Sequence, residues 1–332
     1  MLVSLFLLPL FYVSSHEGTS CYHCLMKIVI TDKIDIDNAA TKKLKDLPAT
    51  VFEDTPKTDE EIISRVKDAE IITANYIDIT PSIIDACPKL KYIIVPAVGY
   101  EWVDYKYAAT KGIKVINSPT HNSLAVAEHA IALLFASVRN LFPAQTSLQA
   151  GKWKSRDFRG IELHGKKLGL VGYGNIGKNI EAMAQGLGMK CSYVKSKSTS
   201  DELDSLLGES DVVVLCASLN DATRGLIDSR RLGLLKPTAY LVNVARGAIV
   251  DQEALMQALR GHKIAGAALD VFADEPLVGE PNDQIVQMSK LPNVIATPHI
   301  GYNTQETTVR LGEEIYANIV ACMDGRPQNL VN

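Results

Sequence analysis

The sequence of 332 residues lacks several features that would point to a particular environment or partner. It has little excess charge of one sign, because a formal net charge of −4 offers no general attraction to nucleic acid or to an anionic membrane. It has no dense cysteine framework: six cysteines scattered through a long chain predict reduced thiols and a cytoplasmic location. It also lacks an internal repeat or a low-complexity tract. The cysteines are Cys21, Cys24, Cys87, Cys191, Cys216 and Cys322.

The first 25 residues differ from the rest of the chain. Residues 2–13 are apolar but too short to span a bilayer, and no Lys or Arg precedes Lys27 to form the basic region of a signal peptide. Membrane insertion is therefore not predicted, and an export signal is disfavoured. Cys21 and Cys24 have a metal-like spacing, yet no second Cys/His pair follows nearby, so no metal site is predicted. We interpret residues 1–25 as an extension outside the fold and Met26 as the natural start.

Short apolar runs alternate with helix-length segments from Lys27 onward, a pattern typical of parallel sheets covered by helices. The predicted fold class is α/β, with two Rossmann-like or flavodoxin-like parallel-sheet domains, because the chain is too long for one ordinary domain. Residues 26–120 and 303–332 would form a discontinuous first domain, and residues 121–302 the second. A long apolar helix at 123–141 would connect the domains, and a final helix at 304–323 would return the chain. Strands are expected at 28–30, 71–72, 92–95, 114–116, 167–171, 191–194, 211–216, 239–244, 264–269 and 294–296.

A Gly-rich turn directly follows the apolar run at 167–171 and opens a helix-patterned segment. Gly172 permits the tight strand-to-helix turn, Gly174 lets the backbone approach a pyrophosphate, and Gly177 lets helix and strand pack closely. The free N–H groups and the positive end of the helix dipole would face the phosphates. The motif, in this context, predicts dinucleotide binding. Its residues are Gly172, Tyr173, Gly174, Asn175, Ile176 and Gly177.

Three further segments place polar residues beside predicted strand ends, where open α/β sheets bind ligands. They are Asn-Val-Ala-Arg-Gly at 243–247, Ala-Leu-Asp-Val-Phe-Ala-Asp-Glu-Pro at 268–276 and Thr-Pro-His-Ile-Gly at 297–301. With the Gly-rich turn, and in this order, they make the chain from about Met26 onward closely resemble the D-isomer-specific 2-hydroxyacid dehydrogenases. The resemblance implies an NAD(P)-dependent oxidoreductase acting on a CH–OH group, with the first domain binding the substrate and the second binding the dinucleotide.

Hydride transfer between a 2-hydroxy acid and a nicotinamide needs a cation for the carboxylate and an acid/base for the hydroxyl proton. Arg246 suits the first task because its planar fork grips a carboxylate and stays charged. His299 suits the second because imidazole titrates near neutral pH. Glu275 would orient the imidazole and stabilise its protonated form. All three stand at the catalytic positions that the resemblance implies.

In the first domain, the run at 96–104 resembles the family's loop whose backbone amides receive the substrate carboxylate. The resemblance also assigns Asn75 to a pocket-facing position. The substrate-binding residues implied in this loop are Ala97, Val98 and Gly99.

Relatives that act on phosphorylated substrates usually have Arg or Lys in these two segments, where this chain has Asn75 and Pro96. An unphosphorylated 2-keto acid such as glyoxylate or hydroxypyruvate is therefore favoured over 3-phosphoglycerate. The run Asn-Ser-Leu at 122–124 also occurs in phosphoglycerate-type relatives and favours the opposite choice.

The cofactor preference is predicted from charge. NAD-specific relatives carry Asp about 20 residues after the first Gly of the turn. This chain has Lys195, Ser196 and Lys197 there, which would bind a 2′-phosphate, so NADP(H) is favoured over NAD(H). The alternative is an exposed turn that does not contact the cofactor. The resemblance assigns further cofactor contacts to Ala217, Ser218, Thr223, Val244, Ala245, Arg246, Asp270, His299 and Gly301.

Other functions stay open at this point. They are a phosphoglycerate dehydrogenase-like enzyme, an oxidative relative acting on formate or phosphite, and a non-enzymatic, dinucleotide-sensing corepressor. The family usually forms dimers through the helix at 123–141 and its neighbours. The apolar stripe of this segment agrees with a homodimer, although burial inside one chain would give the same pattern.

Overall fold

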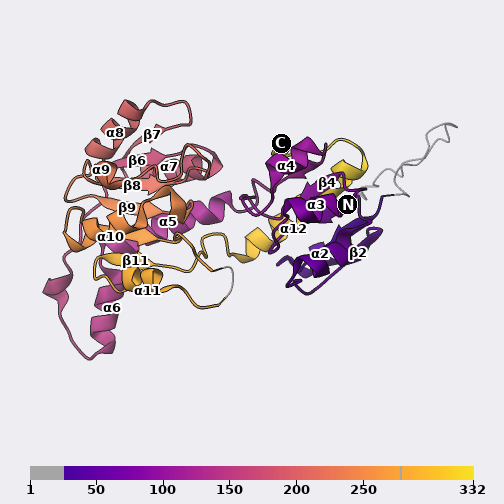
Figure 1. The fold of residues 1–332 in the computed structure, drawn as a ribbon. Helices are drawn as coiled ribbons and strands as arrows, with labels where there is room; N and C mark the ends of the chain where they lie inside the picture. The colour runs from indigo at the N-terminus through magenta and orange to yellow at the C-terminus, as the bar shows by residue number, and fades with distance from the viewer. Residues whose placement is uncertain (1–25, 277–278) are drawn as a thin grey trace, which may run out of the picture.

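A computed structural model describes residues 26–276 and 279–332, so the interpretation of residues 1–25 lies outside the described residues. Two lobes are visible in Figure 1, one coloured mainly indigo and purple and the other pink and orange. Each lobe is built on its own parallel sheet, with five strands in the first and six in the second. The predicted α/β class with two parallel-sheet domains is confirmed.

The first sheet has the strand order β2-β1-β3-β4-β5. Three of its strands consist of wholly buried residues, as expected for parallel strands covered on both faces. The edge strand β2 was not predicted, because none of its side chains is buried and its sequence Ala-Thr-Val shows no apolar run. The elements are β1 (Ile28–Ile30), α1 (Asn38–Lys45), β2 (Ala49–Val51), α2 (Asp59–Val66), β3 (Ile71–Thr73), α3 (Pro81–Asp85), β4 (Tyr92–Ile94), α4 (Tyr105–Thr110) and β5 (Lys114–Ile116).

The last helix, α12 (Gln305–Met323), belongs to this first lobe, although it follows the second in the chain. Ile315 and Ile319 are fully buried in one cluster with Ile28, Ile30 and Ile94 of the first sheet. The first domain is therefore discontinuous, as predicted. The boundaries proposed at 120/121 and 302/303 stay predictions.

The second sheet has the strand order β11-β10-β9-β8-β6-β7, and all its pairs are parallel. The order reverses beside β6, and open α/β sheets bind ligands at such a switch point. Its elements, with the connecting helices, are α5 (Ser123–Val138), α6 (Leu141–Gln149), η2 (Ser155–Phe158), β6 (Lys167–Val171), α7 (Asn175–Gly186), β7 (Lys190–Val194), α8 (Ser200–Glu209), β8 (Val212–Leu215), α9 (Ser229–Leu232), β9 (Tyr240–Asn243), η3 (Gly247–Ile249), α10 (Gln252–Arg260), β10 (Gly266–Leu269), α11 (Asp283–Ser289) and β11 (Val294–Ala296).

The helix predicted at 123–141 is observed as α5, which ends three residues earlier, at Val138, and a second helix, α6, follows it. Asn140 adopts a left-handed φ of 52°, which ends α5 and starts α6 in a new direction. The apolar stripe of α5 is buried inside this chain, where Ala127, Leu134 and Val138 pack with Leu168 and Leu170 of β6. Burial within one chain, the alternative left open above, thus accounts for the stripe.

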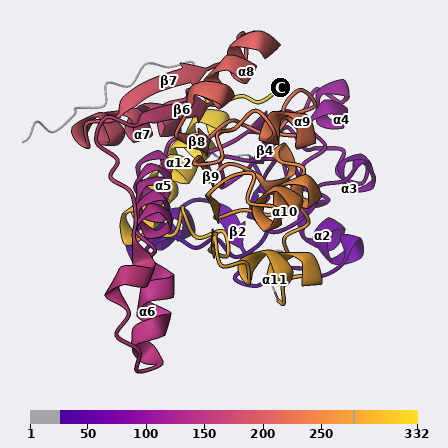
Figure 2. The same ribbon diagram turned by 90° about the vertical axis from the view of Figure 1, so that its left-hand side faces the viewer.

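Helices α5 and α6 are also the segments to consider as a possible membrane span. In the described part of the chain, no single helix is long and apolar enough to cross a membrane. The two together meet that criterion of length and composition, but the chain bends by 61° between them. Helix α6 projects away from the second lobe in both views (Figures 1 and 2).

Candidate active site at the strand ends

The Gly-rich turn joins β6 to α7 as predicted, and each glycine has a separate structural reason. Gly172 has a φ of 98°, and a Cβ there would lie 2.6 Å from the backbone nitrogen of Ala217. A Cβ at Gly177 would lie 2.8 Å from the carbonyl oxygen of Gly172. At Gly174, by contrast, a Cβ would meet nothing within 4 Å. Gly174 therefore borders open space, where a ligand can approach the backbone.

The N-terminus of α7 faces this space without a cap of its own. Gly174 is the N-cap residue and has no side chain to accept a hydrogen bond from the first turn. Asn175 and Ile176 begin the helix, so their N–H groups lack intrahelical acceptors. Free donors and the positive end of the helix dipole are suited to a pyrophosphate. The residues present thus fit a dinucleotide.

The segment predicted to contact the 2′-phosphate lies against the same turn. Tyr173 stacks on Tyr193 of β7 with ring centroids 3.7 Å apart, and the Nζ atom of Lys195 is 5.1 and 5.0 Å from the two centroids. A hydrogen bond from the Tyr173 hydroxyl to Glu181, with partial burial, raises the pKa of Tyr173 to about 12. Lys195, Ser196 and Lys197 are all exposed. Lys195 therefore presents its charge beside the Gly-rich turn.

The predicted cofactor residues after β8 and β9 line the neighbouring strand ends. Ala217 contacts the Gly172 turn, and the Thr223 hydroxyl donates to the carbonyl oxygen of Ser218 at 2.7 Å, which closes the loop after β8. Val244 and Ala245 are buried directly after β9. These residues shape the rim of the open space, and their contact with a cofactor stays a prediction.

Arg246 leaves the sheet because of two neighbours. The side-chain oxygen of buried Asn243 accepts from the backbone N–H of Ala245 at 3.1 Å, and its nitrogen donates to the carbonyl oxygen of Arg246 at 3.1 Å. A Cβ at Gly247 would lie 1.8 Å from the carbonyl carbon of Phe272, so only glycine fits there. The turn thereby presents the Arg246 side chain to the first domain.

The guanidinium of Arg246 reaches the predicted carboxylate loop. Its Nε atom donates to Glu101 at 3.1 Å, and a Cβ at Gly99 would lie only 2.0 Å from its Nη2 atom. Among the described residues, the backbone N–H groups of Val98 and Gly99 have no hydrogen-bond acceptor. The loop itself is held in place, since Ala97 and Val98 accept hydrogen bonds through their carbonyl oxygens. A cation and two free N–H donors therefore lie together.

His299 and Glu275, predicted as an acid and its orienting carboxylate, lie in contact, and their catalytic roles stay predictions. The Nδ1 atom of His299 lies 2.5 Å from Oε1 of Glu275, and Oε2 of Glu275 accepts from the backbone N–H of Phe272 at 3.1 Å. No residue in the described ranges hydrogen-bonds Nε2 of His299, which leaves this atom available to a ligand. The arrangement can hold a carboxylate at Arg246 and transfer a proton at His299.

Asp270 organises the loop that carries His299. Its carboxylate accepts from the backbone N–H groups of Ile300 and Gly301 at 2.9 and 2.8 Å, from Thr297 at 2.6 Å, and interacts with His129 at 3.2 Å. Burial alone would raise the pKa of Asp270, but these hydrogen bonds outweigh it and hold the pKa below its usual value. The predicted contacts of Asp270 and Gly301 with the cofactor stay predictions.

Asn75 does not present a free amide to the site. Its side-chain nitrogen donates to the carbonyl oxygen of Lys33 at 2.9 Å. The adjacent Tyr76 is 41% exposed instead, and its hydroxyl faces Tyr302, three residues after His299. This bond uses one N–H of the amide, and the substrate contact predicted for Asn75 stays a prediction.

Four residues near the site were not predicted: Glu101, His129, Tyr76 and Tyr302. Glu101 lies within the run at 96–104 and Tyr302 close to the motif at 297–301, so proximity in sequence could have suggested both. Tyr76 directly follows the predicted Asn75, so proximity could have suggested it too, whereas His129 offered no such signal because its contacts depend on how distant segments pack.

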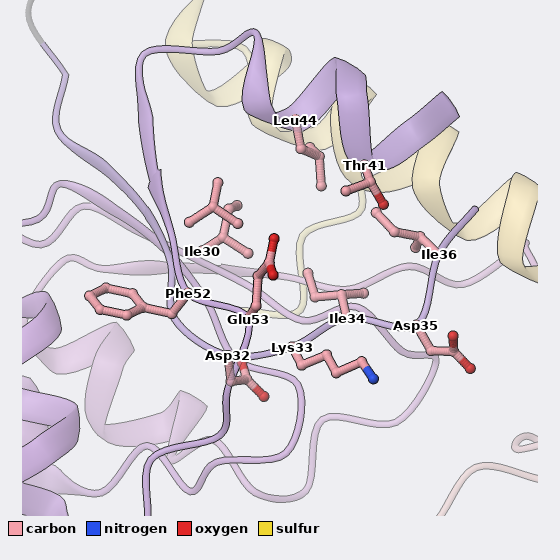
Figure 3. Close-up of a pocket in the computed structure, with 11 residues that line it drawn as sticks. Ile30, Asp32, Lys33, Ile34, Asp35, Ile36, Thr41, Leu44, Phe52 and Glu53 are labelled. Atoms are coloured by element: carbon pink, nitrogen blue, oxygen red, sulfur yellow. The ribbon is translucent and has the colours of Figure 1, made fainter. Parts of the chain in front are cut away.

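A separate hollow of about 280 Å³ lies beside β1, β2 and α1 (Figure 3). None of the predicted site residues lines it. In the described ranges, no group of three or more His, Cys, Asp or Glu side chains could hold a metal ion.

Comparison with known proteins agrees with this site. The model of the NAD binding domain of D-isomer specific 2-hydroxyacid dehydrogenases matches residues 131–301. The chain is 36% identical to the glyoxylate reductase of Thermococcus onnurineus (strain NA1) over 327 residues, covering 92% of this chain and 96% of the relative. The chain belongs to the D-isomer specific 2-hydroxyacid dehydrogenase family. It is thus an NAD(P)-dependent oxidoreductase acting on a CH–OH group.

Two further relatives mark the breadth of this similarity. The glycerate dehydrogenase of Methylorubrum extorquens (strain ATCC 14718 / DSM 1338 / JCM 2805 / NCIMB 9133 / AM1) is 35% identical over 315 residues, which are 92% of this chain and 98% of the relative. A solved acyclic imino acid reductase (Bsp5) in complex with NADPH and D-Arg has a TM-score of 0.84 and 29% identity, covering 92% of this chain and all of the other. The names of these similar proteins give different substrates, so the similarity does not fix the substrate of this chain.

Proposed function

We propose that this protein reduces small, unphosphorylated 2-keto acids such as glyoxylate or hydroxypyruvate, with NADPH as the preferred reductant. The single observation that carries the proposal is the 2.5 Å pairing of His299 with Glu275, in the same chain that places Arg246 against the Gly99 loop. The glyoxylate reductase and glycerate dehydrogenase relatives support this substrate class.

Different residues would bind the substrate carboxylate and donate the proton. Arg246 and the free N–H groups of Val98 and Gly99 bind the substrate carboxylate. His299 donates a proton from Nε2 to the carbonyl oxygen, while Glu275 holds Nδ1 and stabilises the imidazolium before transfer. A bound nicotinamide supplies the hydride to the carbonyl carbon. Proton and hydride together convert the keto group to the hydroxyl.

Charge at the site supports an unphosphorylated substrate. Asn75 and Pro96 place no cation in the two first-domain segments, and Glu101 adds a carboxylate within 3.1 Å of Arg246. A dianionic phosphate near this carboxylate would be repelled. A small substrate with a single negative charge, held by Arg246, avoids that repulsion.

The preference for NADPH rests on Lys195. Its ammonium group is held beside the Gly-rich turn by two tyrosine rings, where an NAD-specific enzyme would carry an acid. The similar imino acid reductase binds NADPH, which supports the same choice here.

We also propose a homodimer formed through α6 rather than α5. Leu141, Phe142 and Leu148 are 52%, 56% and 54% exposed, and Trp153 just beyond the helix is 86% exposed. Apolar side chains on a projecting helix (Figures 1 and 2) suit an interface with a second copy of the chain. The four free cysteines of the described residues support the proposed cytoplasmic location.

A substrate panel tests the proposal. Purified protein should oxidise NADPH with glyoxylate or hydroxypyruvate, more slowly with 3-phosphohydroxypyruvate, and more slowly with NADH. Absence of turnover with every 2-keto acid would refute the proposed reaction. Efficient turnover of 3-phosphohydroxypyruvate would refute the substrate class alone.

A further inference from the structure

Two tyrosines from different domains meet beside the proposed acid/base. Tyr302 lies edge-on to His299, with ring centroids 5.9 Å apart and an interplanar angle of 83°. Its hydroxyl faces that of Tyr76, which follows β3 in the first domain. Burial, together with this neighbouring phenol, raises the pKa of Tyr302 to about 12. Tyr302 is therefore neutral across the physiological range.

The position of Tyr76 is set by a buried carboxylate. Asp32 is fully buried after β1, and its two oxygens accept from the backbone N–H groups of Asn75 and Tyr76 at 3.2 and 2.7 Å. Asp32 is also among the residues labelled around the hollow in Figure 3. These hydrogen bonds fix the backbone at Tyr76, and the Tyr76 side chain lies against Tyr302 of the second domain.

The pair retains hydrogen-bonding capacity. Each phenol carries one donor and can accept, and a bond between the two uses only one donor. No other residue in the described ranges hydrogen-bonds either hydroxyl. Tyr76 and Tyr302 are also 41% and 38% exposed, unusually high for aromatic rings beside a site. A donor and an acceptor thus remain for a ligand in the cleft.

We propose that Tyr76 and Tyr302 together recognise the C3 hydroxyl of a three-carbon substrate and so favour hydroxypyruvate over pyruvate. The inference rests on the proposed function. With the carboxylate at Arg246 and the carbonyl oxygen at His299, the third substituent of C2 is the only part of the substrate still without a partner. A hydroxymethyl group can donate to and accept from the two phenols, whereas a methyl group offers them no hydrogen bond.

The matched substrates hydroxypyruvate and pyruvate, which differ by this hydroxyl, provide the test. Tyr302→Phe keeps the ring beside His299 and should lower kcat/KM for hydroxypyruvate roughly threefold to tenfold, the value of one neutral hydrogen bond. Pyruvate and glyoxylate should change by less than about twofold, because neither has a C3 hydroxyl. Tyr76→Phe should act in the same direction, and the double variant should lose less than the product of the two effects, since both belong to one pair.

Tyr107→Phe is the matched control, because the Tyr107 hydroxyl bonds exposed Asp85 far from these residues in the sequence and outside the site. It should leave all three substrates unchanged. Equal losses with hydroxypyruvate and glyoxylate in Tyr302→Phe would overturn the inference, because a scaffold role affects every substrate. An unchanged preference would overturn it as well.

A binding measurement separates this inference from the proposed reaction. By calorimetry in the presence of NADP⁺, D-glycerate should bind more tightly than D-lactate to the wild type and with similar affinity to Tyr302→Phe. If no 2-keto acid were reduced, the proposed reaction would fail, and the D-glycerate comparison would still support or overturn the role of the tyrosines.

Discussion

Replacing Gly99 with alanine should abolish most of the activity while leaving the fold intact. A Cβ at this position would lie 2.0 Å from Nη2 of Arg246, 2.4 Å from Oε2 of Glu101 and 3.1 Å from Cζ of Arg246. These atoms lie at the ends of flexible side chains, and φ of Gly99 is not positive, so the backbone can accept the methyl group. The added methyl group should therefore displace the Arg246 guanidinium rather than destabilise the backbone.

The size of the effect follows from the displacement. Ordinary van der Waals contact begins at 3.4 Å, so Nη2 must retreat by about 1.4 Å from its 2.0 Å position. A displacement of about 1 Å in a positioning group can cost roughly 100-fold in rate. We expect kcat/KM for glyoxylate to fall about 100-fold, close to 2.7 kcal/mol of transition-state stabilisation.

Steady-state kinetics and denaturant unfolding on the same preparation check this expectation. Gly186→Ala at the end of α7 is the control, because a Cβ there meets nothing within 4 Å; it should retain activity and stability. If Gly99→Ala kept kcat/KM within about threefold of wild type, the placement of Arg246 at the substrate carboxylate would be refuted. A loss of activity that merely followed unfolding would refute the argument about flexible side chains.

Three further predictions address the acid/base, the cofactor and a buried carboxylate. His299→Ala should lower kcat by at least about 100-fold with cofactor binding retained, measured by nicotinamide fluorescence, whereas exposed His164→Ala should have no effect; a wild-type kcat in His299→Ala would exclude this residue as the acid. Lys195→Asp should shift the kcat/KM ratio of NADPH to NADH about tenfold or more toward NADH, since it replaces an attraction by a repulsion, and an unchanged ratio would show that this turn does not contact the phosphate. Burial raises the pKa of Asp32 from 3.8 to about 6 despite the N–H groups of Asn75 and Tyr76, so the folded chain binds the proton more tightly than the unfolded chain. Relative to Asp32→Asn, the wild-type free energy of unfolding should therefore fall by about 2 kcal/mol as the pH rises from about 4 to about 6, and a pH-independent difference would contradict this assignment.

Much of the second sheet could be predicted because its central strands β6, β8, β9 and β10 are largely buried. Such strands are continuous apolar runs, and the run at 167–171 matches β6 to the residue. Edge strand β2 has no such pattern, since one of its faces borders solvent. The helix predicted to end at 141 ends at Val138, because Asn140 adopts a left-handed conformation that the sequence pattern does not indicate.

The site likewise contains residues that local motifs could predict and residues whose contacts depend on distant segments. Arg246, Glu275 and His299 lie in short motifs at strand ends, and a parallel sheet brings such ends to one edge. Glu101 and Tyr76 come from loops of the other domain, and their partners Arg246 and Tyr302 are more than 140 residues away in the sequence, a separation of 145 for the Glu101 pair. Local patterns carry no information on such pairings. The contact predicted for Asn75 stays a prediction, because a family position does not specify which acceptor the side-chain amide bonds; here one N–H bonds the carbonyl oxygen of Lys33.

Two residues beside the proposed acid/base adopt a strained backbone conformation, and a buried carboxylate stabilises one of them. Asp274 and His299 adopt positive φ values of 54° and 51°, immediately before Glu275 and at the imidazole itself. Non-glycine residues in this region cost about 1 kcal/mol or more each, so other interactions must hold them. Asp270 supplies those interactions for His299: its carbonyl oxygen accepts from the N–H of His299 at 2.8 Å, and its carboxylate accepts from the next two N–H groups. The buried carboxylate therefore acts through His299, keeping the imidazole in a conformation that the chain alone would not adopt.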